Sequence, residues 1–157
     1  MEGTPLRNKS EIERIYRSDG SRLWWSLVAF TGDREIASDA VAEAFAQALR
    51  RGEDIRDPLA WIWRVAYKIA AAELKRRPDS MEEANEAVVP SEQGAVELIE
   101  VLRRLPMQQR AAVVLHYYAD LPVSEIAPLM AISTATVKVH LHRGRARLRT
   151  LLEDEDG

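Results

Sequence analysis

VSEIAPLMAISTATVKVHLHRGRARLR, residues 123–149, is the stretch that decides the fold class of this chain. The spacing of its apolar residues predicts two helices joined by a tight corner at Ala131-Ile132-Ser133. Ser133 is suited to be the N-cap of the second helix, because its hydroxyl can accept a hydrogen bond from a backbone N–H of the first turn. The buried side of the pair is provided by Ile126, Leu129, Ile132, Val137 and Leu141. The stretch therefore predicts a helix-turn-helix.

The second helix of this pair is strongly basic. After the corner, no acidic residue occurs before Glu153. The basic side chains are Lys138, His140, His142, Arg143, Arg145, Arg147 and Arg149. A basic helix behind a tight turn is typical of a part that enters the major groove of DNA. The alternative is a solvated basic face on an ordinary helical hairpin, since short motifs also match by chance.

The net charge of −3 hides this basic face. Residues 78–100 contain seven acidic residues and no lysine or arginine, whereas residues 101–152 contain eight basic and only two acidic residues. Charge segregated in this way favours binding of a polyanion by the second part of the chain. The chain has no cysteine, which excludes a disulfide framework, a cysteine-based zinc site and a thiol nucleophile.

The cellular compartment is predicted from two further features. Residues 1–20 contain no apolar core of a signal peptide, and no apolar run approaches the roughly 18 residues of a membrane span. We therefore expect a soluble, cytoplasmic protein with no membrane segment of its own.

The remaining residues also show helical periodicity and no strand-like alternation. Residues 11–30 predict two short helices with a bend at Asp19-Gly20-Ser21, followed by helices at 34–50 and 58–77. Residues 79–93 are acidic and poor in large apolar residues, which predicts a flexible linker. Helical periodicity resumes at Ala95, so the sequence predicts an all-α protein made of two small helical domains.

The two halves together resemble the extracytoplasmic-function group of bacterial RNA polymerase sigma factors. The first match comprises RLWWSLVAFTGDREIASDAVAEAFAQALRR and IRDPLAWIWRVAYKIAAAELKRR, which resemble the promoter-melting domain. The second is VLRRLPMQQRAAVVLHYYADLPVSEIAPLMAISTATVKVHLHRGRARLR, which resembles the domain that binds the upstream promoter element. The resemblance implies a sigma region 2-like domain at 1–78, a linker at 79–93 and a region 4-like domain at 94–157.

In this family the helix matching residues 34–50 docks on core RNA polymerase. Asp39, Glu43 and Gln47 recur at i, i+4 and i+8 and form a polar ridge, so the resemblance makes them candidates for that contact. The alternative is that the ridge only solvates an exposed helix face.

The loop at residues 52–57 and the helix after it match the part of the family that captures an extruded base of the minus-10 element and holds the single-stranded non-template strand. Such a surface needs basic and aromatic side chains. Trp61 shares a stripe with Val65 and is predicted to be core, which leaves Trp63 as the better stacking candidate. The candidates are Arg56, Trp63, Arg64, Lys68, Lys75, Arg76 and Arg77.

In the second half, the family reads the minus-35 element with the helix after Ser133. The residues implied to lie at this duplex are Thr136, Lys138, Val139, His142 and Arg143, with Arg110, Arg145 and Arg149 suited to phosphate contacts. Arg143 is our candidate for a base contact, because a bidentate arginine discriminates guanine by about 1–3 kcal/mol. Residues 113–118 are predicted to be core first and a polymerase-binding surface second.

Four positions depart from the family pattern. Lys68 and Ala72 stand where an asparagine and an aspartate are frequent, and Val139 replaces a common serine. Ala131 replaces the usual turn glycine, and a Cβ in a left-handed corner costs about 1 kcal/mol. We therefore expect an unusual promoter sequence or one weak DNA contact.

No catalytic or metal site is predicted. His140 and His142 are two residues apart on a helix, so they point to different faces and cannot share a metal ion. We expect no cofactor and no enzymatic activity. The partners implied by the resemblance are core RNA polymerase, promoter DNA and an anti-sigma factor. Two alternatives remain: a helix-turn-helix regulator that does not engage core polymerase, and a protein whose helices mainly pack on an inhibitory partner.

Overall fold

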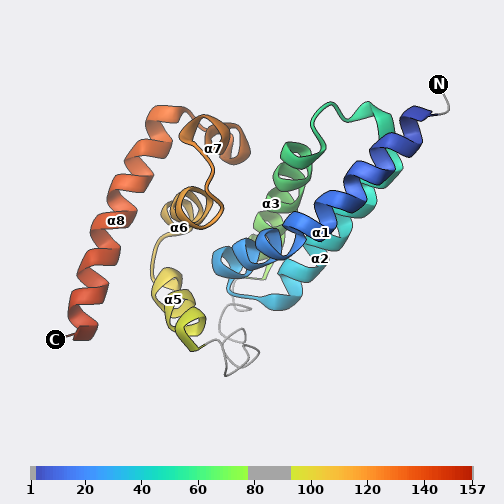
Figure 1. Ribbon diagram of the computed structural model, residues 1–157. Coiled ribbons are helices and arrows are strands. Elements are labelled where there is room, and N and C mark those ends of the chain that lie inside the picture. The colour runs from blue at the N-terminus through green and yellow to red at the C-terminus, as the bar shows by residue number, and fades with distance from the viewer. Residues whose placement is uncertain (1–2, 78–92, 157) are drawn as a thin grey trace.

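The computed structural model describes residues 3–77 and 93–156. Figure 1 shows two groups of helices, the first built from α1 to α3 and the second from α5 to α8. No strand occurs within the two described ranges, and the predicted all-α fold class is confirmed. The elements are α1 (Gly3–Thr31), α2 (Arg34–Arg51), the 3-10 turn η1 (Gly52–Asp54), α3 (Pro58–Arg76), α5 (Gln93–Arg103), α6 (Met107–Val113), the π-helical turn η3 (Val114–Tyr118), α7 (Val123–Met130) and α8 (Thr134–Asp156).

α2 and α3 begin where the sequence provides N-caps. The carboxylate of Asp33 accepts hydrogen bonds from the backbone N–H groups of Glu35 and Ile36, with N···O distances of 2.8 and 3.1 Å. Asp57 caps α3 in the same way, and Pro58 follows at the first helical position, where no N–H is needed. These two helices were predicted to within one residue at each end. The predicted linker lies outside the described residues, except for Gln93, where α5 begins.

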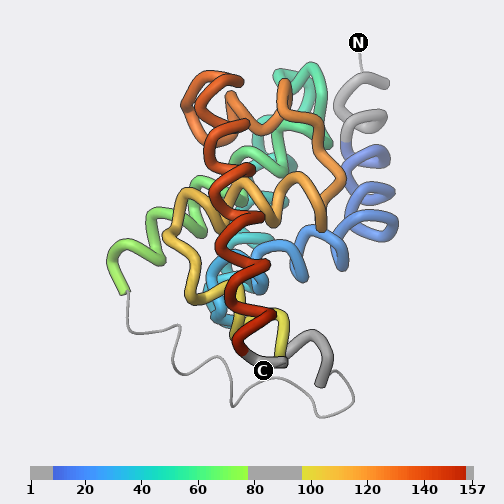
Figure 2. The backbone as a smooth tube through the Cα atoms, turned by 90° about the vertical axis from the view of Figure 1, so that its left-hand side faces the viewer, coloured from blue at the N-terminus to red at the C-terminus, as the bar shows by residue number. Residues whose placement is uncertain are grey.

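The prediction of two short helices across residues 11–30 is wrong, because α1 runs through this region without a break. Gly20 lies inside the helix, where a glycine costs only about 1 kcal/mol relative to alanine. Burial of Ile15 and Leu23 on either side of it outweighs that cost. A bend is nevertheless present. The Ser18 hydroxyl donates to the carbonyl oxygen of Arg14, a bond that often bends helices, and Figure 2 shows the axis of α1 changing direction partway along.

The corner between α7 and α8 has helix-turn-helix geometry. Ala131 ends α7 in the left-handed conformation, with φ 57° and ψ 42°. The Ser133 hydroxyl accepts a hydrogen bond from the Thr136 N–H at 3.1 Å, as expected of an N-cap. Ile126 of α7 and Val137 of α8 are fully buried. The predicted corner is confirmed, and so is the strained alanine at its centre.

The two groups of helices share their apolar cores. Phe30 of α1 and Tyr67 of α3 belong to the cluster that also contains Leu102 and Leu105 of the second group. In the opposite direction, Ile99 of α5 and Ala119 lie in the cluster formed by α1, α2 and α3. Figure 2 shows the second group lying against the first. The sequence analysis predicted the helices but not this arrangement.

A close approach of α8 to α6 generates a stability prediction at Gly144. A Cβ at this position would lie 2.8 Å from Cγ2 of Val113, a side chain that is stiff at χ1. Overpacking costs about 1–3 kcal/mol, which exceeds the helix-propensity gain of about 1 kcal/mol. Gly144→Ala should therefore lower the free energy of unfolding by up to about 2 kcal/mol in urea denaturation.

Gly20→Ala is the matched control for this substitution. A Cβ at Gly20 would meet only Tyr16 at 3.7 Å, an ordinary contact, so this variant should gain about 0.5–1 kcal/mol of stability. Equal effects of the two substitutions would contradict the close approach at Gly144.

The left-handed corner generates a second stability prediction. Ala131→Gly removes the Cβ strain at φ 57° and should raise the free energy of unfolding by about 0.5–1 kcal/mol, after the larger entropy of glycine in the unfolded chain is subtracted. Ala135→Gly, in the exposed first turn of α8, should instead lower it by a similar amount. Thermal or urea unfolding of both variants measures the difference in sign.

Candidate nucleic-acid interface

α8 buries one side against the rest of the second group and exposes the other. Val137, Leu141 and Gly144 are buried on the inner side. The residues predicted to face DNA lie elsewhere on the helix: Thr136 is half-buried, and Lys138, Val139, His142, Arg143, Arg145 and Arg149 are exposed. Figure 1 shows α8 at the edge of the molecule farthest from α1 and α2. The basic face of α8 is therefore open to a large partner.

Arg110 does not belong to this face. It was predicted to contact phosphate, but its side chain is only 4% exposed and points into the boundary between the two groups of helices. Its Nε donates to the carbonyl oxygen of Phe30 at 2.6 Å, and its Nη1 donates to that of Leu105 at 3.1 Å. Arg110 therefore joins α6 to the last turn of α1, and its assignment as a DNA contact is corrected.

The environment of Arg110 is apolar apart from these carbonyl groups. Its guanidinium lies 5.7 Å from the centre of the Phe30 ring, which in turn packs at 5.0 Å on the ring of Tyr67. Burial lowers the pKa of Arg110 to about 10, which leaves the group charged at neutral pH. Burial also raises the pKa of Tyr67 to about 12, so the phenol stays neutral. The site is a buried cation held by neutral acceptors.

The basic candidates on α3 are accessible. Arg64, Lys68 and Lys75 recur at i, i+4 and i+11, which places them on one exposed face of α3, and Arg56 is exposed in the loop before it. Arg76 and Arg77 both form ion pairs with Glu73, and these hydrogen bonds hold the pKa of the Glu73 carboxyl below its usual value. The structure thus places four of these basic residues on α3, Arg77 directly after its last residue, and Arg56 in the loop before its first residue.

The two tryptophans of α3 are reversed relative to the prediction. Trp63 is buried, with 6% of its surface exposed, whereas Trp61 is only half-buried and lies 5.8 Å below the guanidinium of Arg51. Trp63 is therefore not an exposed stacking platform in this structure. Helical spacing failed here because the neighbours of Trp63 come from other parts of the chain, which the periodicity of α3 does not record. Trp63 shares a buried cluster with Ala119 of the second group, and the guanidinium of Arg22 lies 6.0 Å from the centre of its ring.

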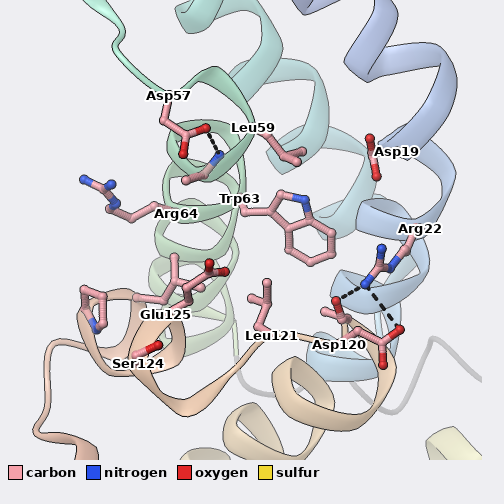
Figure 3. A pocket seen from close by; sticks show the side chains of 14 residues that line it. Asp19, Arg22, Asp57, Leu59, Trp63, Arg64, Asp120, Leu121, Ser124 and Glu125 are labelled. Carbon is pink, nitrogen blue, oxygen red and sulfur yellow. Dashed lines mark hydrogen bonds and ion pairs between the residues drawn. The ribbon is translucent and has the colours of Figure 1, made fainter.

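A cavity of about 480 Å³ lies between α1, α3, residues 119–121 and one side of α7. Figure 3 shows Trp63 and Arg22 pointing towards each other across it, while Arg64 points away. Arg22 donates to the carbonyl oxygen of Ala119 and forms an ion pair of 3.6 Å with Asp120. Leu121, which follows Asp120 in the chain, also lines the cavity. The second group thus covers the face of α3 that carries Trp63.

The polar ridge on α2 faces solvent. Asp39 and Glu43 are exposed, and Gln47 is half-buried. Glu43 accepts hydrogen bonds from Gln47 at 3.0 Å and Arg50 at 3.1 Å, and these bonds lower the pKa of its carboxyl. Glu43 and Gln47 are therefore held in a defined position, and the lowered pKa keeps the Glu43 carboxylate charged at neutral pH.

Two features are absent from the part of the chain that the structure describes. Among the described residues, no group of three or more histidine, cysteine, aspartate or glutamate side chains is placed to hold a metal ion. Within the same ranges, no helix combines the length and the apolar character that a membrane crossing requires.

Sequence reasoning missed three residues that form contacts near the candidate surfaces. Arg22 and Asp120 form the ion pair across the cavity, and Tyr117 accepts a hydrogen bond from Arg145 at 2.6 Å. No local pattern marks the first pair, since it joins residues far apart in the chain. The exposure of Tyr117 follows from the π-helical turn, which also has no sequence signature.

Comparison with known proteins gives two kinds of match. A model of the family "Sigma-70, region 4" matches residues 95–148, which include the helix-turn-helix. The RNA polymerase sigma-E factor of Streptomyces antibioticus is 30% identical over 161 residues, covering 93% of this chain and 87% of that protein. The sigma factor SigV of Bacillus subtilis (strain 168) is 27% identical over 150 residues, covering 90% of this chain and 89% of that protein.

Solved structures show the same fold. CnrH, determined with the cytosolic domain of CnrY, superposes with a TM-score of 0.77 at 20% identity, covering 98% of this chain and 94% of CnrH. The sigma factor RpoE from Bartonella quintana, determined with the anti-sigma factor NepR, gives a TM-score of 0.73 at 18% identity, covering 92% and 96%. With the full-length sequence matches, these likenesses lead to one conclusion: the chain belongs to the extracytoplasmic-function group of RNA polymerase sigma factors.

Proposed function

We propose that this chain joins core RNA polymerase, binds the minus-35 element with α8, and helps to open the minus-10 element with α3, while catalysis resides in the polymerase. The observation that carries the proposal is the open basic face of α8 behind a helix-turn-helix corner, in a chain that belongs to the sigma factors. Under this proposal residues 1–78 and 94–157 are the two functional domains, and residues 79–93 connect them. The protein acts in the cytoplasm, where its polymerase works.

Two rows of side chains on α8 are suited to different contacts with the minus-35 element, one with base edges and one with phosphates. Lys138, His142, Arg145 and Arg149 recur at i, i+4, i+7 and i+11 and form one row. Val139 and Arg143 lie in a neighbouring row about 100° further round the helix. A helix in the major groove reads base edges with one row and contacts the flanking backbone with another. Arg143 and Val139 are suited to guanine and to the thymine methyl group, and the lysine and arginines of the first row to phosphates.

The exposed basic face of α3 is suited to the single-stranded non-template strand. Unstacking a base costs a few kcal/mol, which a protein without ATP hydrolysis recovers through electrostatic contacts and stacking. Arg56, Arg64, Lys68 and Lys75 supply the charge in this scheme. Trp63 becomes available for stacking only after the second group of helices moves away. We therefore propose that promoter opening requires the two groups to separate.

The ridge on α2 is the proposed contact with core polymerase. Its two exposed carboxylates, on Asp39 and Glu43, can pair with basic side chains of a partner, and the adjacent Gln47 offers a neutral donor and acceptor. We also propose that an anti-sigma factor binds the chain and holds it inactive, because the similar sigma factor RpoE was determined in complex with an anti-sigma factor, NepR. A regulator that ignores core polymerase remains the competing proposal, because the face of α8 alone would serve it equally well.

Transcription in vitro with core polymerase on genomic fragments tests the proposal directly. We expect specific start sites that depend on the added chain. Reversing the ridge charges with Asp39→Lys/Glu43→Lys should weaken binding to core polymerase by about tenfold or more, because like charges then face each other at the contact. Glu13→Lys/Glu97→Lys, which changes the charge equally at exposed sites on α1 and α5, is the matched control. Undiminished core binding by the ridge variant would remove α2 from the contact, and no core binding by the wild-type chain would favour the regulator.

The proposed separation of the two groups can be tested by cross-linking across the cavity. The chain has no cysteine, so Arg22→Cys/Asp120→Cys introduces the only two thiols. Joining them with a bismaleimide that contains a reducible disulfide should leave duplex binding intact, since the face of α8 stays open, but should block open-complex formation. Reductant should restore transcription, and the double variant without cross-linker serves as the control. Normal transcription by the cross-linked protein would show that separation is not required.

A further inference from the structure

The surface beside the C-terminal half of α8 carries aromatic residues that the proposed function leaves unused. α6 continues into the π-helical turn η3, in which the Ala119 N–H bonds to the Val114 carbonyl oxygen at 3.0 Å, one residue further back than in an α-helix. Val114 and Leu115 stay buried, but Tyr117 is 51% exposed. A tyrosine this exposed on a basic surface calls for an explanation other than core packing.

Tyr117 is held in a defined position on both sides. Its ring packs edge-to-face on the ring of His116, with centroids 4.8 Å apart and an interplanar angle of 80°. His116 is itself fixed, because its Nδ1 lies 3.0 Å from the Leu121 carbonyl oxygen. At the other end, the Tyr117 hydroxyl accepts a hydrogen bond of 2.6 Å from Nη1 of Arg145. The tyrosine thus connects the π-helical turn to the DNA-facing row of α8.

The chemistry of this pair fits an anion. A tyrosine hydroxyl that accepts from arginine still has its own proton to donate, and the guanidinium has four further N–H donors. Among the described residues, no carboxylate forms an ion pair with Arg145. Two adjacent donor groups with positive charge between them match the oxygens of a phosphate. Lys138 and Arg149 continue the same exposed row, which suits a polyanion rather than a single ion.

We infer that Tyr117 and Arg145 form a two-residue clamp on one phosphate of the duplex bound by α8. Tyr117 donates its O–H to the phosphate and holds the guanidinium of Arg145 in the orientation that pairs with the same group. Pre-ordering the arginine reduces the side-chain entropy lost on binding. This inference rests on the proposed role of α8 and adds to it a positioning residue that lies outside the helix-turn-helix.

A phosphate contact does not depend on base sequence, so a fluorescein-labelled duplex of mixed sequence is a sufficient probe. Anisotropy titrations of the full chain at several salt concentrations measure affinity and its salt dependence. Tyr117→Phe keeps the ring but removes the hydroxyl, and should weaken binding about two- to tenfold at every salt concentration without changing the slope. Arg145→Gln should weaken binding and reduce the slope of log K against log salt by about 0.9, as expected for one lost phosphate contact.

The double variant Tyr117→Phe/Arg145→Gln tests whether Tyr117 affects DNA binding by positioning Arg145 or only by stabilising the fold. If the tyrosine acts through the arginine, the double variant should bind only slightly more weakly than Arg145→Gln alone. Tyr16→Phe, at a 60% exposed tyrosine on α1, should bind as the wild type does. Thermal unfolding checks that each variant remains folded.

The outcomes distinguish this inference from the proposed function. Wild-type affinity in Tyr117→Phe, or strictly additive losses in the double variant, would overturn the clamp while leaving α8 as the DNA-binding helix. Failure of the wild-type chain to bind duplex at any salt concentration would overturn both.

Discussion

The guanidinium group of Arg110 determines how the two halves of this chain meet. A buried cation without partners is strongly destabilising, so it must lie where acceptors converge. The last turn of α1 supplies one acceptor, because the last carbonyl groups of a helix have no partner within it and carry the negative end of the helix dipole. The connection between α5 and α6 supplies the other. Phe30 and Leu105 provide one each, on either side of the boundary between the halves. Satisfying this charge therefore constrains how the two halves meet, together with the apolar clusters that they share.

That arrangement leaves one of the two proposed DNA-binding surfaces open and covers the other. The basic face of α8 is open, because α8 buries only its inner side against its own group of helices. The face of α3 that carries Trp63 is instead covered by residues 119–121, which Arg22 anchors to α1. Under the proposed function, a sigma factor in this form can bind duplex DNA with α8 but cannot hold a flipped base on Trp63. The order implied is duplex recognition first and strand capture afterwards.

The sequence predicts this molecule well wherever the deciding interaction is local. The starts of α2 and α3, just after Asp33 and Asp57, and the corner at Ala131 depend on residues within a few positions of each other, and the two helix starts and the corner were placed correctly. The failures involve distant partners. Arg110 and Trp63 have typical DNA-binding side chains, yet contacts with residues more than 50 positions away remove both from the surface. Gly20 shows a related limit, since burial along α1 overrides a local helix-breaking signal.

The interactions that hold the two groups of helices together differ in salt dependence from those proposed to bind DNA. Phosphate contacts by α8 release counterions and weaken steeply as salt rises. The bonds of Arg110 run to neutral carbonyl oxygens within an apolar boundary, where salt screens little. The exposed ion pair between Arg22 and Asp120 contributes little to the stability of this contact, because such pairs contribute at most about 1 kcal/mol. Under the proposed function, rising salt therefore weakens the binding of duplex DNA without separating the two halves of the chain. Separation of the halves must come from a partner that offers better contacts than Arg110 now has, and a surface as large as that of core polymerase can provide them.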